Sequence, residues 1–343
     1  MHLLYLGNVL SRYGYTPTTI ETLSDRFSAD FKVTNASNKK NKLLRLLDMW
    51  LHLFKFRSKV NLVMIDTYSS SAFLFAWTSA RICEWLGLPY VAYLHGGDLP
   101  KRFTKSPKIS QRYLVKAKAI VAPSGYLQNE VSQKFNLPVT CIPNYLDLSN
   151  YPFTLRKQID SINLLWVRSF HEIYQPQVAI ELVALLAKEA LPTKLTMVGP
   201  DKDGSLEKCQ ILATKLGVEG IVTFTGRLTK EQWITLSADH NIFINTTSVD
   251  NTPVSVMEAM ALGMPVVTTK VGGIPYLIKE GKEGIMVDEF TAETFRKAIL
   301  ELRQNNRLVE SLSQNARTKA ETWDWAVVRK MWLNLLSDPN LKG

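Results

Sequence analysis

Short hydrophobic runs alternate with segments of helical periodicity along the whole chain. Each run is followed by a loop and then by a segment with apolar residues every three or four positions, such as Gln177–Ala187 or Ala292–Leu302. Strands that alternate with helices are typical of parallel sheets built from βαβ units. The pattern therefore predicts an α/β fold with strands at Leu3–Leu6, Asn61–Ile65, Tyr90–Leu94, Ala119–Val121, Ile162–Val167, Lys194–Val198, Ile221–Phe224, Ile242–Asn245 and Pro265–Thr268.

The alternation stops once, between Asn150 and Asp160, where the chain is polar and has no clear period. We interpret this segment as a linker. The chain has 343 residues, and domains commonly contain roughly 100–200 residues, so two domains are expected. The prediction is a first α/β domain over residues 1–155 and a second over residues 156–324, each with its own parallel sheet.

The composition is that of a globular protein, with 46% hydrophobic and 21% charged residues. This excludes a mainly disordered chain, a collagen-like fibre and a disulfide-rich miniprotein. No apolar run is long enough for a spanning helix, and Met1–Leu6 is interpreted as a strand and not as a signal peptide. Cys83, Cys141 and Cys209 form no C-x-x-C pair, so a reducing cytoplasm is the expected location.

The net charge of +10 is concentrated in the first half of the chain. Residues 1–157 contain 21 Lys and Arg against 9 Asp and Glu, a net of +12, whereas the remainder contains 20 against 22, a net of −2. A basic half favours nucleic acid, anionic lipid or a phosphorylated ligand. Aromatic residues do not interleave with the basic runs as in RNA-binding motifs, so no nucleic-acid partner is expected.

A glycine-bearing loop follows the first strand. Gly7 ends the strand, Gly14 follows, and Thr16-Pro17 has the features of a helix opening. Such a loop can direct backbone N–H groups at a phosphate. The glycines do not match G-x-G-x-x-G, so a dinucleotide fingerprint is not supported, and a tight packing turn is the alternative.

A second polar loop, His95-Gly96-Gly97-Asp98, follows the strand that ends at Leu94. Polar side chains at the carboxyl end of a parallel strand lie where α/β proteins bind ligands, and the glycines let a ligand approach the backbone. A loop histidine with purely structural hydrogen bonds is the alternative. No H-x-H or cysteine partner accompanies His95, so no metal site is predicted.

The most informative stretch runs from Asp250 to Val267. Its two carboxylates, Asp250 and Glu258, are eight positions apart on a loop that becomes a helix. Pro253 suits the start of that helix and Ser255 can cap it, so an anion or a set of hydroxyl groups can bind at its N-terminus. Ordinary helix acids with turn glycines are the alternative interpretation.

The segment from Asp250 to Pro275, which ends in Val271-Gly272-Gly273-Ile274-Pro275, resembles the signature of the retaining glycosyltransferases of family 4, which have the GT-B fold. That signature is E-x7-E, then A-x-A-x-G-x-P-V-V, then a V-G-G-I/L-P loop. The resemblance implies two facing Rossmann-like domains with a cleft between them, and a last helix, about 325–343, that crosses back to the first domain. Weaker matches follow in family order, at the Gly7/Gly14 loop and at segments 95–98, 122–124, 142–144, 198–200, 224–226 and 323–325.

The resemblance also implies roles for individual residues. Asp250 would contact the donor sugar, Glu258 the ribose, Arg168 the diphosphate, and His95 would lie near the anomeric centre. The implied catalytic residues are His95, Asp98, Arg168 and Asp250, and the implied donor-binding residues are Gly7, Arg168, Asp250, Asn251, Thr252, Pro253, Val254, Ser255 and Glu258.

Two positions depart from the family pattern. Asp250 replaces the more common glutamate, which shortens the side chain by one methylene group. The family lysine that follows the arginine is absent, and Ile173 or Tyr174 stands in its place. Either Arg168 and helix dipoles hold the diphosphate, or another cation contributes, for which the candidates are Arg227, Lys101 and Arg102.

The expected activity is transfer of a sugar from a UDP- or GDP-sugar to a hydroxyl of a saccharide or lipid-linked acceptor, with retention, in cell-surface polysaccharide or glycolipid assembly. No cofactor and no metal are expected, since the Asp201-Lys202-Asp203 sequence is interpreted as a loop near the nucleotide. The alternatives are a sugar-nucleotide epimerase or hydrolase of the same fold, and a non-catalytic basic protein at a membrane surface.

One helix also suggests a membrane surface. Between Arg45 and Lys59 a wide apolar arc is combined with a narrow basic stripe, and the run Lys101–Lys118 has seven cations and no acid. Such segments suit an anionic bilayer, with Trp50 and Leu53 facing the lipid. The expected location is cytoplasmic, with peripheral association at the cytosolic face of the membrane. A core helix with a solvated stripe is the alternative.

Overall fold

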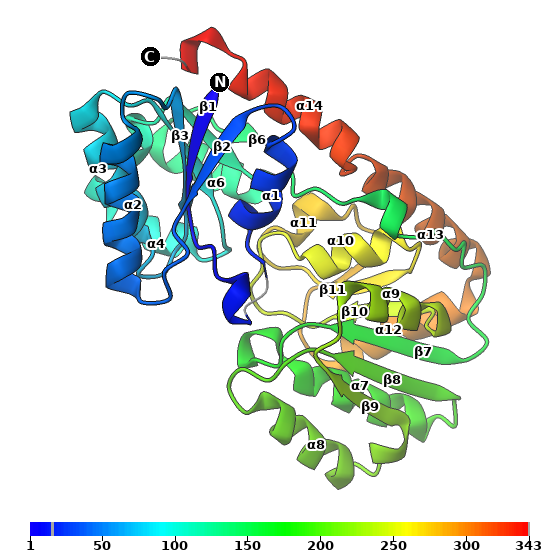
Figure 1. Cartoon of the computed structure of the whole chain (residues 1–343). Helices are drawn as coiled ribbons and strands as arrows, with labels where there is room; N and C mark the ends of the chain where they lie inside the picture. The colour runs from blue at the N-terminus through cyan, green and yellow to red at the C-terminus, as the bar shows by residue number, and fades with distance from the viewer. Residues whose placement is uncertain (15–16, 342–343) are drawn as a thin grey trace. The chain divides into compact units, whose positions relative to one another are not determined.

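The structure, a computed structural model, describes residues 1–14 and 17–341, and the chain forms two compact units (Figure 1). The first unit contains Met1–Pro143 and the chain from Lys330 onward, and the second contains Asn144–Arg329. Each unit is a six-stranded sheet in which all paired strands are parallel. Two Rossmann-like domains of α/β class are therefore confirmed.

The sheet of the first unit has the strand order β2-β1-β3-β4-β5-β6. Figure 1 shows α2 and α3 together on one side of this sheet and α1 on the other. The strands are β1 (His2–Leu6), β2 (Lys32–Ala36), β3 (Leu62–Thr67), β4 (Tyr90–Leu94), β5 (Ala119–Ala122) and β6 (Thr140–Cys141). The helices are α1 (Thr19–Phe27), α2 (Lys42–Phe56), α3 (Phe73–Leu86), α4 (Leu99–Lys105), α5 (Pro107–Val115) and α6 (Gly125–Phe135), with a short 3₁₀ turn at Ser11–Tyr13.

The sheet of the second unit has the order β12-β11-β10-β7-β8-β9. Its strands are β7 (Ile162–Val167), β8 (Thr193–Val198), β9 (Val222–Gly226), β10 (Ile242–Asn245), β11 (Val266–Thr269) and β12 (Ile285–Val287). Its helices are α7 (Pro176–Lys188), α8 (Ser205–Lys215), α9 (Lys230–Leu236), α10 (Val254–Ala261), α11 (Ile274–Leu277), α12 (Ala292–Gln304) and α13 (Asn306–Glu321). Helix α14 (Trp325–Leu336) follows, and 3₁₀ turns lie at Leu148–Asn150, Glu172–Tyr174, Glu219–Ile221, Ser237–Asp239 and Pro339–Leu341.

The central strands are buried on both faces, which explains why they occur as continuous apolar runs in the sequence. Every residue of β1, β3 and β4 is buried, as is every residue of β10 and β11. The first unit also takes up the last part of the chain, because Trp332 of α14 packs edge-on against Phe27 of α1 and Tyr93 of β4. Trp332, Leu336 and Leu341, all buried, therefore complete the core of the first unit.

The boundary between the units lies at Pro143, whereas the sequence pattern suggested residue 155. Residues 144–155 pack on the second unit, where Leu146 pairs with Asp324 and Tyr151 is buried. Arg156, in the segment interpreted as a linker, is also buried, and its guanidinium donates to the carbonyl oxygen of Leu262 at 2.7 Å. Arg156 is thus engaged with the second unit, whereas the other polar residues of the segment, such as Thr154, Lys157 and Gln158, are exposed.

The expected helix opening at Thr16-Pro17 falls partly outside the described residues, because Thr16 is not described. Helix α1 begins at Thr19, and the Glu21 carboxylate accepts from the backbone N–H of Thr18 at 2.9 Å. This contact satisfies one of the free N–H groups at the start of a helix.

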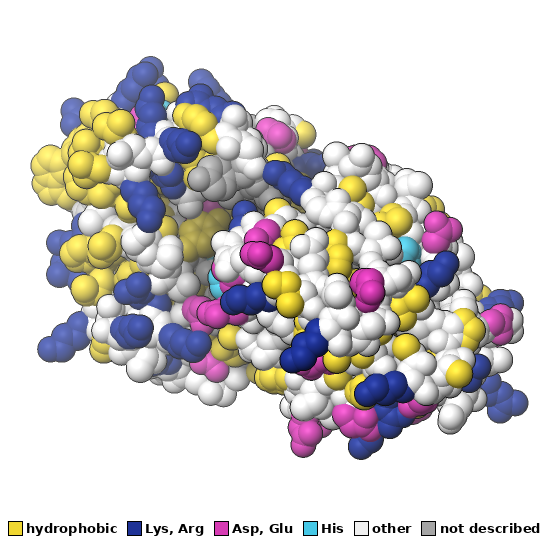
Figure 2. Space-filling model, turned by 90° about the horizontal axis from the view of Figure 1, so that it is seen from below, with side chains coloured by type: hydrophobic (Ala, Val, Ile, Leu, Met, Phe, Trp, Pro, Cys, Tyr) yellow, Lys and Arg dark blue, Asp and Glu magenta, His cyan; other side chains and the backbone are white. Residues whose placement is uncertain are grey.

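Positive charge is a property of the first unit. Met1–Pro143 with Lys330–Gly343 contains 21 Lys and Arg against nine Asp and Glu, a net of +12. In the space-filling view of Figure 2, basic side chains outnumber acidic ones on the visible face of this unit. Among the described residues, no helix is long and apolar enough to cross a membrane.

Candidate functional site

In the second unit, Arg168 directly follows β7 and is held in place from three directions. Its backbone N–H donates to the carbonyl oxygen of Val198 at 3.0 Å, and its guanidinium forms an ion pair with the Asp250 carboxylate. The guanidinium also lies over the ring of Tyr174, 4.3 Å from the centroid. Burial lowers the pKa of Arg168, while Tyr174 acts in the opposite direction. The Nε atom has no hydrogen-bond partner among the described residues, so one buried donor is left for a ligand.

The close approach of β8 to Arg168 requires a glycine. A Cβ atom on Gly199 would lie 1.7 Å from the carbonyl oxygen of Arg168, and the residue has φ +152°. Gly199 therefore allows the loops after β7 and β8 to lie against each other, and its place after Val198 explains the Val-Gly-Pro sequence there.

Two adjacent glycines, Gly272 and Gly273, support the Asp250 loop. The N–H of Gly273 donates to the carbonyl oxygen of Asp250 at 3.1 Å. A Cβ atom on Gly272 would lie 2.0 Å from that same oxygen, and one on Gly273 would lie 1.7 Å from the carbonyl oxygen of Asn251. The loop that follows β11 therefore fixes the backbone that carries Asp250.

Glu258, one turn into α10, is 5% exposed and has two partners. Its Oε1 atom accepts from the hydroxyl of Tyr151 at 2.7 Å and pairs with the Nζ atom of Lys230 at 2.7 Å. Burial, and after it the Glu258 charge, raises the pKa of Tyr151 above its usual range, so the phenol stays protonated and donates. Lys230 is half exposed at the start of α9 and brings a cation to this carboxylate.

The start of α10 presents buried hydroxyl groups. The side-chain oxygens of Thr252 and Ser255 are buried and have no hydrogen-bond partner among the described residues. Pro253 is the N-cap and Val254 the first helical residue, while Asn251 is buried beside Asp250. Unsatisfied hydroxyls and free N–H groups at a helix N-terminus suit a polar or anionic ligand.

The Asp201-Lys202-Asp203 sequence lies in the loop before α8, whose N-cap is Gly204. The Oδ1 atom of Asp201 accepts from the backbone N–H groups of Lys202 and Gly204 at 2.9 and 3.1 Å, and Asp203 accepts from those of Glu172 and Ser205 at 2.8 and 3.1 Å. Hydrogen bonding to backbone N–H groups accounts for both carboxylates. Within residues 1–14 and 17–341, no three His, Cys, Asp or Glu side chains cluster as metal ligands.

In the first unit, His95 belongs to a buried polar cluster around Asp66, the fifth residue of β3. The Oδ1 atom of Asp66 lies 2.8 Å from His95 Nε2 and accepts from the hydroxyl of Tyr5 at 2.9 Å. The ring of Tyr68 stacks on His95 with 5.0 Å between centroids. Burial and the Asp66 charge raise the pKa values of Tyr5 and Tyr68 well above their usual range, which keeps both phenols neutral.

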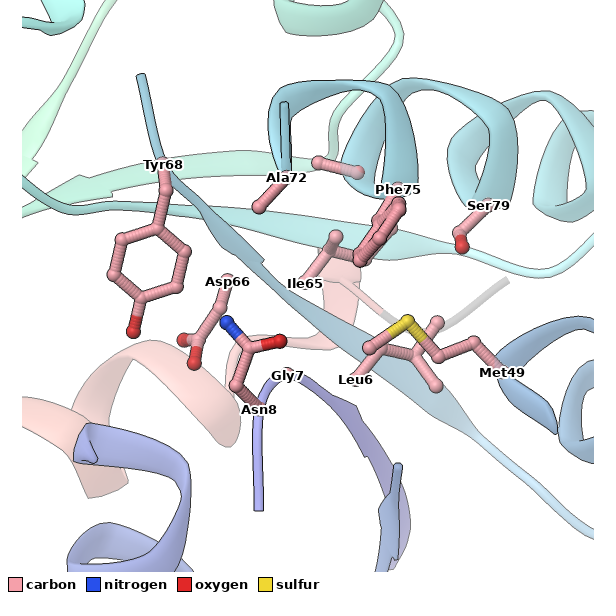
Figure 3. A pocket seen from close by; sticks show the side chains of 11 residues that line it. Leu6, Gly7, Asn8, Met49, Ile65, Asp66, Tyr68, Ala72, Phe75 and Ser79 are labelled. Carbon is pink, nitrogen blue, oxygen red and sulfur yellow. The ribbon is translucent and has the colours of Figure 1, made fainter. Parts of the chain in front are cut away.

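The second oxygen of Asp66, Oδ2, is buried and has no hydrogen-bond partner among the described residues. A Cβ atom on Gly7 would lie 2.5 Å from it, so Gly7 is the residue that leaves room for this carboxylate. A narrow pocket opens beside it, and Figure 3 shows Asp66, Asn8 and Tyr68 at one side. Apolar side chains that include Leu6, Met49, Ile65 and Phe75 line the rest.

The structure thus brings Arg168, Asp250, Asn251 and the start of α10 together, and it joins Glu258 to the neighbouring Lys230 and Tyr151. Asp98 is half exposed and pairs with Lys101 at 3.0 Å, whereas the carboxylate that contacts His95 is Asp66.

Sequence reasoning missed Asp66, Lys230 and Tyr151. A single carboxylate at the end of the buried run Leu62–Thr67 is a signal that could have identified Asp66. Tyr174 occupies the region of the absent family lysine and stacks on Arg168.

Two family models match the chain, and each covers about one unit. Residues 1–150 match the model described as glycosyltransferase family 4, and residues 150–319 match the model described as glycosyl transferases group 1. Together with the two Rossmann-like folds, these matches define the chain as a glycosyltransferase of the GT-B type.

The curated relatives are distant. The chain is 28% identical over 155 residues to D-inositol 3-phosphate glycosyltransferase of Corynebacterium jeikeium, covering 44% of this chain and 37% of the relative. It is 25% identical over 167 residues to the protein of the same name from Corynebacterium glutamicum, covering 48% and 40%. The chain therefore spans about two fifths of the length of these relatives.

Solved structures resemble the whole chain in fold. Alr3699/HepE of Anabaena, in complex with UDP, has a TM-score of 0.78 at 17% identity, with 98% of this chain and 100% of that chain covered. Sucrose-phosphate synthase of Thermosynechococcus elongatus has a TM-score of 0.79 at 14% identity, with 98% of both chains covered. At these identities the likeness establishes the fold.

Proposed function

We propose that this protein transfers a sugar, with retention of anomeric configuration, from a nucleotide diphosphate sugar to a hydroxyl of a saccharide or lipid-linked acceptor. The observation that carries the proposal is the arrangement at the carboxyl edge of the second sheet, where Arg168, Asp250 and the buried hydroxyls at the start of α10 meet. The donor is a UDP- or GDP-sugar. The structures of Alr3699/HepE with UDP and with UDP-glucose support a UDP-sugar as the first candidate.

Each chemical task has a residue suited to it. Negative charge develops on the leaving diphosphate, and the free Nε donor of Arg168 together with the N-terminus of α10 would stabilise that charge. Asp250 orients the sugar hydroxyls, and Glu258, held by Tyr151 and Lys230, accepts from the ribose. The acceptor hydroxyl oxygen attacks the anomeric carbon as the bond to the diphosphate breaks, and the departing phosphate oxygen accepts the hydroxyl proton, so no separate general base is needed.

In the first domain, we assign His95 and Asp66 to the sugar and acceptor side. Asp66 holds His95 in one orientation through its Oδ1 atom, which leaves Oδ2 to accept from a hydroxyl that enters the neighbouring pocket. Asp98 and Gly7, which the family resemblance also implicates, contribute through the loops that carry them. The reaction is proposed to need neither a metal nor a cofactor.

We propose cell-surface polysaccharide or glycolipid assembly as the setting and the cytoplasm, at the membrane surface, as the place of action. The family matches do not favour an epimerase or hydrolase or a non-catalytic membrane protein. Formation of a glycoside in place of free sugar would distinguish transfer from hydrolysis.

The decisive experiment is a calorimetric titration with UDP, GDP and ADP, followed by a donor assay with the matching sugar nucleotides. One nucleotide should bind, and Glu258→Gln should weaken it about ten- to a hundredfold, because a hydrogen bond to a charged group contributes about 1.5–3 kcal/mol. The matched control is Glu207→Gln, an exposed acid in α8.

Three results would each contradict a part of the proposal. Equal nucleotide affinity in Glu258→Gln and the wild type would remove Glu258 from the donor site. Activity that is lost with a chelator and restored by a divalent ion would refute the metal-free mechanism. Proton NMR of the product gives the anomeric configuration, and an inverted product would refute retention.

A further inference from the structure

The outer surface of α2 and α3 is an unusual concentration of exposed apolar side chains. Of the eighteen large hydrophobic side chains exposed among the described residues, seven lie on these two helices. We call them the α2–α3 patch: Leu43, Leu44, Leu47, Leu51 and Phe54 of α2, with Leu74 and Trp85 of α3.

The two helices present these side chains as one surface. The ring of Phe54 packs edge-on against Trp85 with 5.8 Å between centroids, and Trp50 Nε1 donates to the Thr78 hydroxyl at 3.3 Å. Each α2 member is three or four residues from another member, so together they form one helix face. Trp85 is 74% exposed and Leu51 65% exposed, values far above those of a packed face.

This surface corrects the orientation expected for α2. Leu53 is fully buried, and Trp50 is half buried against α3, so these two residues face the first unit and not solvent. The helix is amphipathic as expected, but its exposed face is itself largely leucine. The alternative interpretation of α2, a core helix whose exposed stripe is polar, therefore does not fit this helix.

Cations surround the patch, and acids are few. Residues 37–118 contain 15 Lys and Arg against four Asp and Glu, a net of +11. Exposed cations that include Lys42, Lys55 and Arg57 are on or beside α2. The acids of the two helices are Asp48, which lies 3.6 Å from His52, and Glu84, which pairs with Arg81. Figure 2 shows hydrophobic side chains with Lys and Arg between them on this unit.

We propose that the α2–α3 patch binds the surface of an anionic lipid bilayer, with the apolar side chains in the interface and the surrounding cations against the headgroups. Membrane binding rests on the proposed function only through the acceptor, which would be presented at this surface if it is carried on a lipid. Apolar burial and attraction to anionic lipid add together, which is the behaviour of interfacial amphipathic helices. A second copy of the chain is a poorer occupant, because two surfaces of net positive charge repel each other.

The test is sedimentation of the full-length protein with vesicles. Vesicles of phosphatidylcholine with about one third phosphatidylserine are compared with pure phosphatidylcholine, at about 0.1 M salt and at about 1 M salt, where the Debye length falls from about 10 to about 3 Å. We expect binding to the anionic vesicles to be at least about tenfold stronger and to weaken at high salt.

Two variants and two matched controls locate the contact. Leu51→Glu and Lys55→Glu should each lower binding, about tenfold for Leu51→Glu, with an unchanged Tm because both side chains are exposed. Ile211→Glu, at a residue 63% exposed on α8, and Lys215→Glu make the same changes on the second unit and should leave binding unchanged. Emission of Trp85, obtained by difference from Trp85→Phe, should be quenched by brominated lipid.

Three outcomes would overturn the proposal: no binding of the wild type to anionic vesicles, equal losses in the controls, or a dimer in lipid-free sedimentation that Leu51→Glu dissociates. UDP-glucose titration of the same samples separates this proposal from the proposed function. Donor binding without vesicle binding refutes only the membrane surface, and vesicle binding without donor binding refutes only the transferase assignment.

Discussion

Replacing Gly273 with alanine tests whether the loop after β11 positions the donor site. The added Cβ atom would lie 1.7 Å from the carbonyl oxygen of Asn251, whereas real Cβ contacts stay beyond about 3.0 Å. The Asp250–Asn251 backbone must therefore move by roughly 1.3 Å, since a carbonyl oxygen cannot rotate away as a side chain can. Gly273 has an ordinary φ, so the effect of the substitution is steric and not conformational.

Two effects of different size are expected. Overpacking of this kind costs about 1–3 kcal/mol, which lowers the Tm of a domain of this size by about 2–12 °C. A displacement of about 1 Å in a positioning group can cost about a hundredfold in turnover. Donor affinity and turnover should therefore fall well beyond the loss of stability, because Asp250 and the start of α10 move with the loop.

Gly220→Ala is the matched control, because its Cβ would meet nothing within 4 Å and Gly220 also has an ordinary φ. Calorimetric titration with UDP, the donor assay and a thermal melt are run on both variants at a temperature where each is folded. Donor affinity and turnover of Gly273→Ala equal to those of Gly220→Ala would refute the idea that this loop positions the site.

Two further variants test the polar clusters. Asp66→Asn should reduce turnover about ten- to a hundredfold, because His95 and Tyr5 lose a charged partner. Donor affinity, measured by titration, should stay equal to that of the control variant Asp25→Asn. Burial lowers the pKa of His240, whose Nε2 lies 2.8 Å from the Thr196 hydroxyl, so the unfolded chain takes up this proton first. The contribution of His240 to the free energy of unfolding is therefore fully present well above about pH 6.5. It falls as the pH drops below that value, by up to about 1.4 kcal/mol per pH unit. Denaturant melts at several pH values should show a smaller decline in His240→Gln, and an unchanged decline would contradict this origin.

The strands that sequence reasoning located are those buried in the middle of each sheet. Tyr90–Leu94, Ile162–Val167 and Ile242–Asn245 coincide with β4, β7 and β10, because a central parallel strand is apolar on both faces. The strands missed are β2, β6 and β12, which lie at sheet edges. β2 is mostly exposed or half buried, and β6 has two residues, so neither produces a continuous apolar run.

Some parts of the candidate site could likewise be predicted from the sequence, and others could not. Asp250, Glu258 and the start of α10 belong to one continuous segment, so their proximity follows from local spacing. The contacts of Glu258 with Tyr151 and Lys230, and of His95 with Asp66, join residues 107, 28 and 29 positions apart. No local pattern encodes such contacts. The face of α2 that is buried depends in the same way on α3, which packs against Trp50.

The position of Trp332 has a consequence for the order in which the protein can fold during synthesis. The first unit lacks Trp332, which packs on Phe27 and Tyr93, until the residues after Arg329 have been made. Asn144–Arg329 is 186 residues long, and at about 5–20 residues per second its translation takes about 10–40 s. During that interval a nascent first unit has an incomplete core and an exposed α2–α3 patch, while the second unit, made from one continuous segment, can reach its native state first. The domain translated first is thus the one completed last.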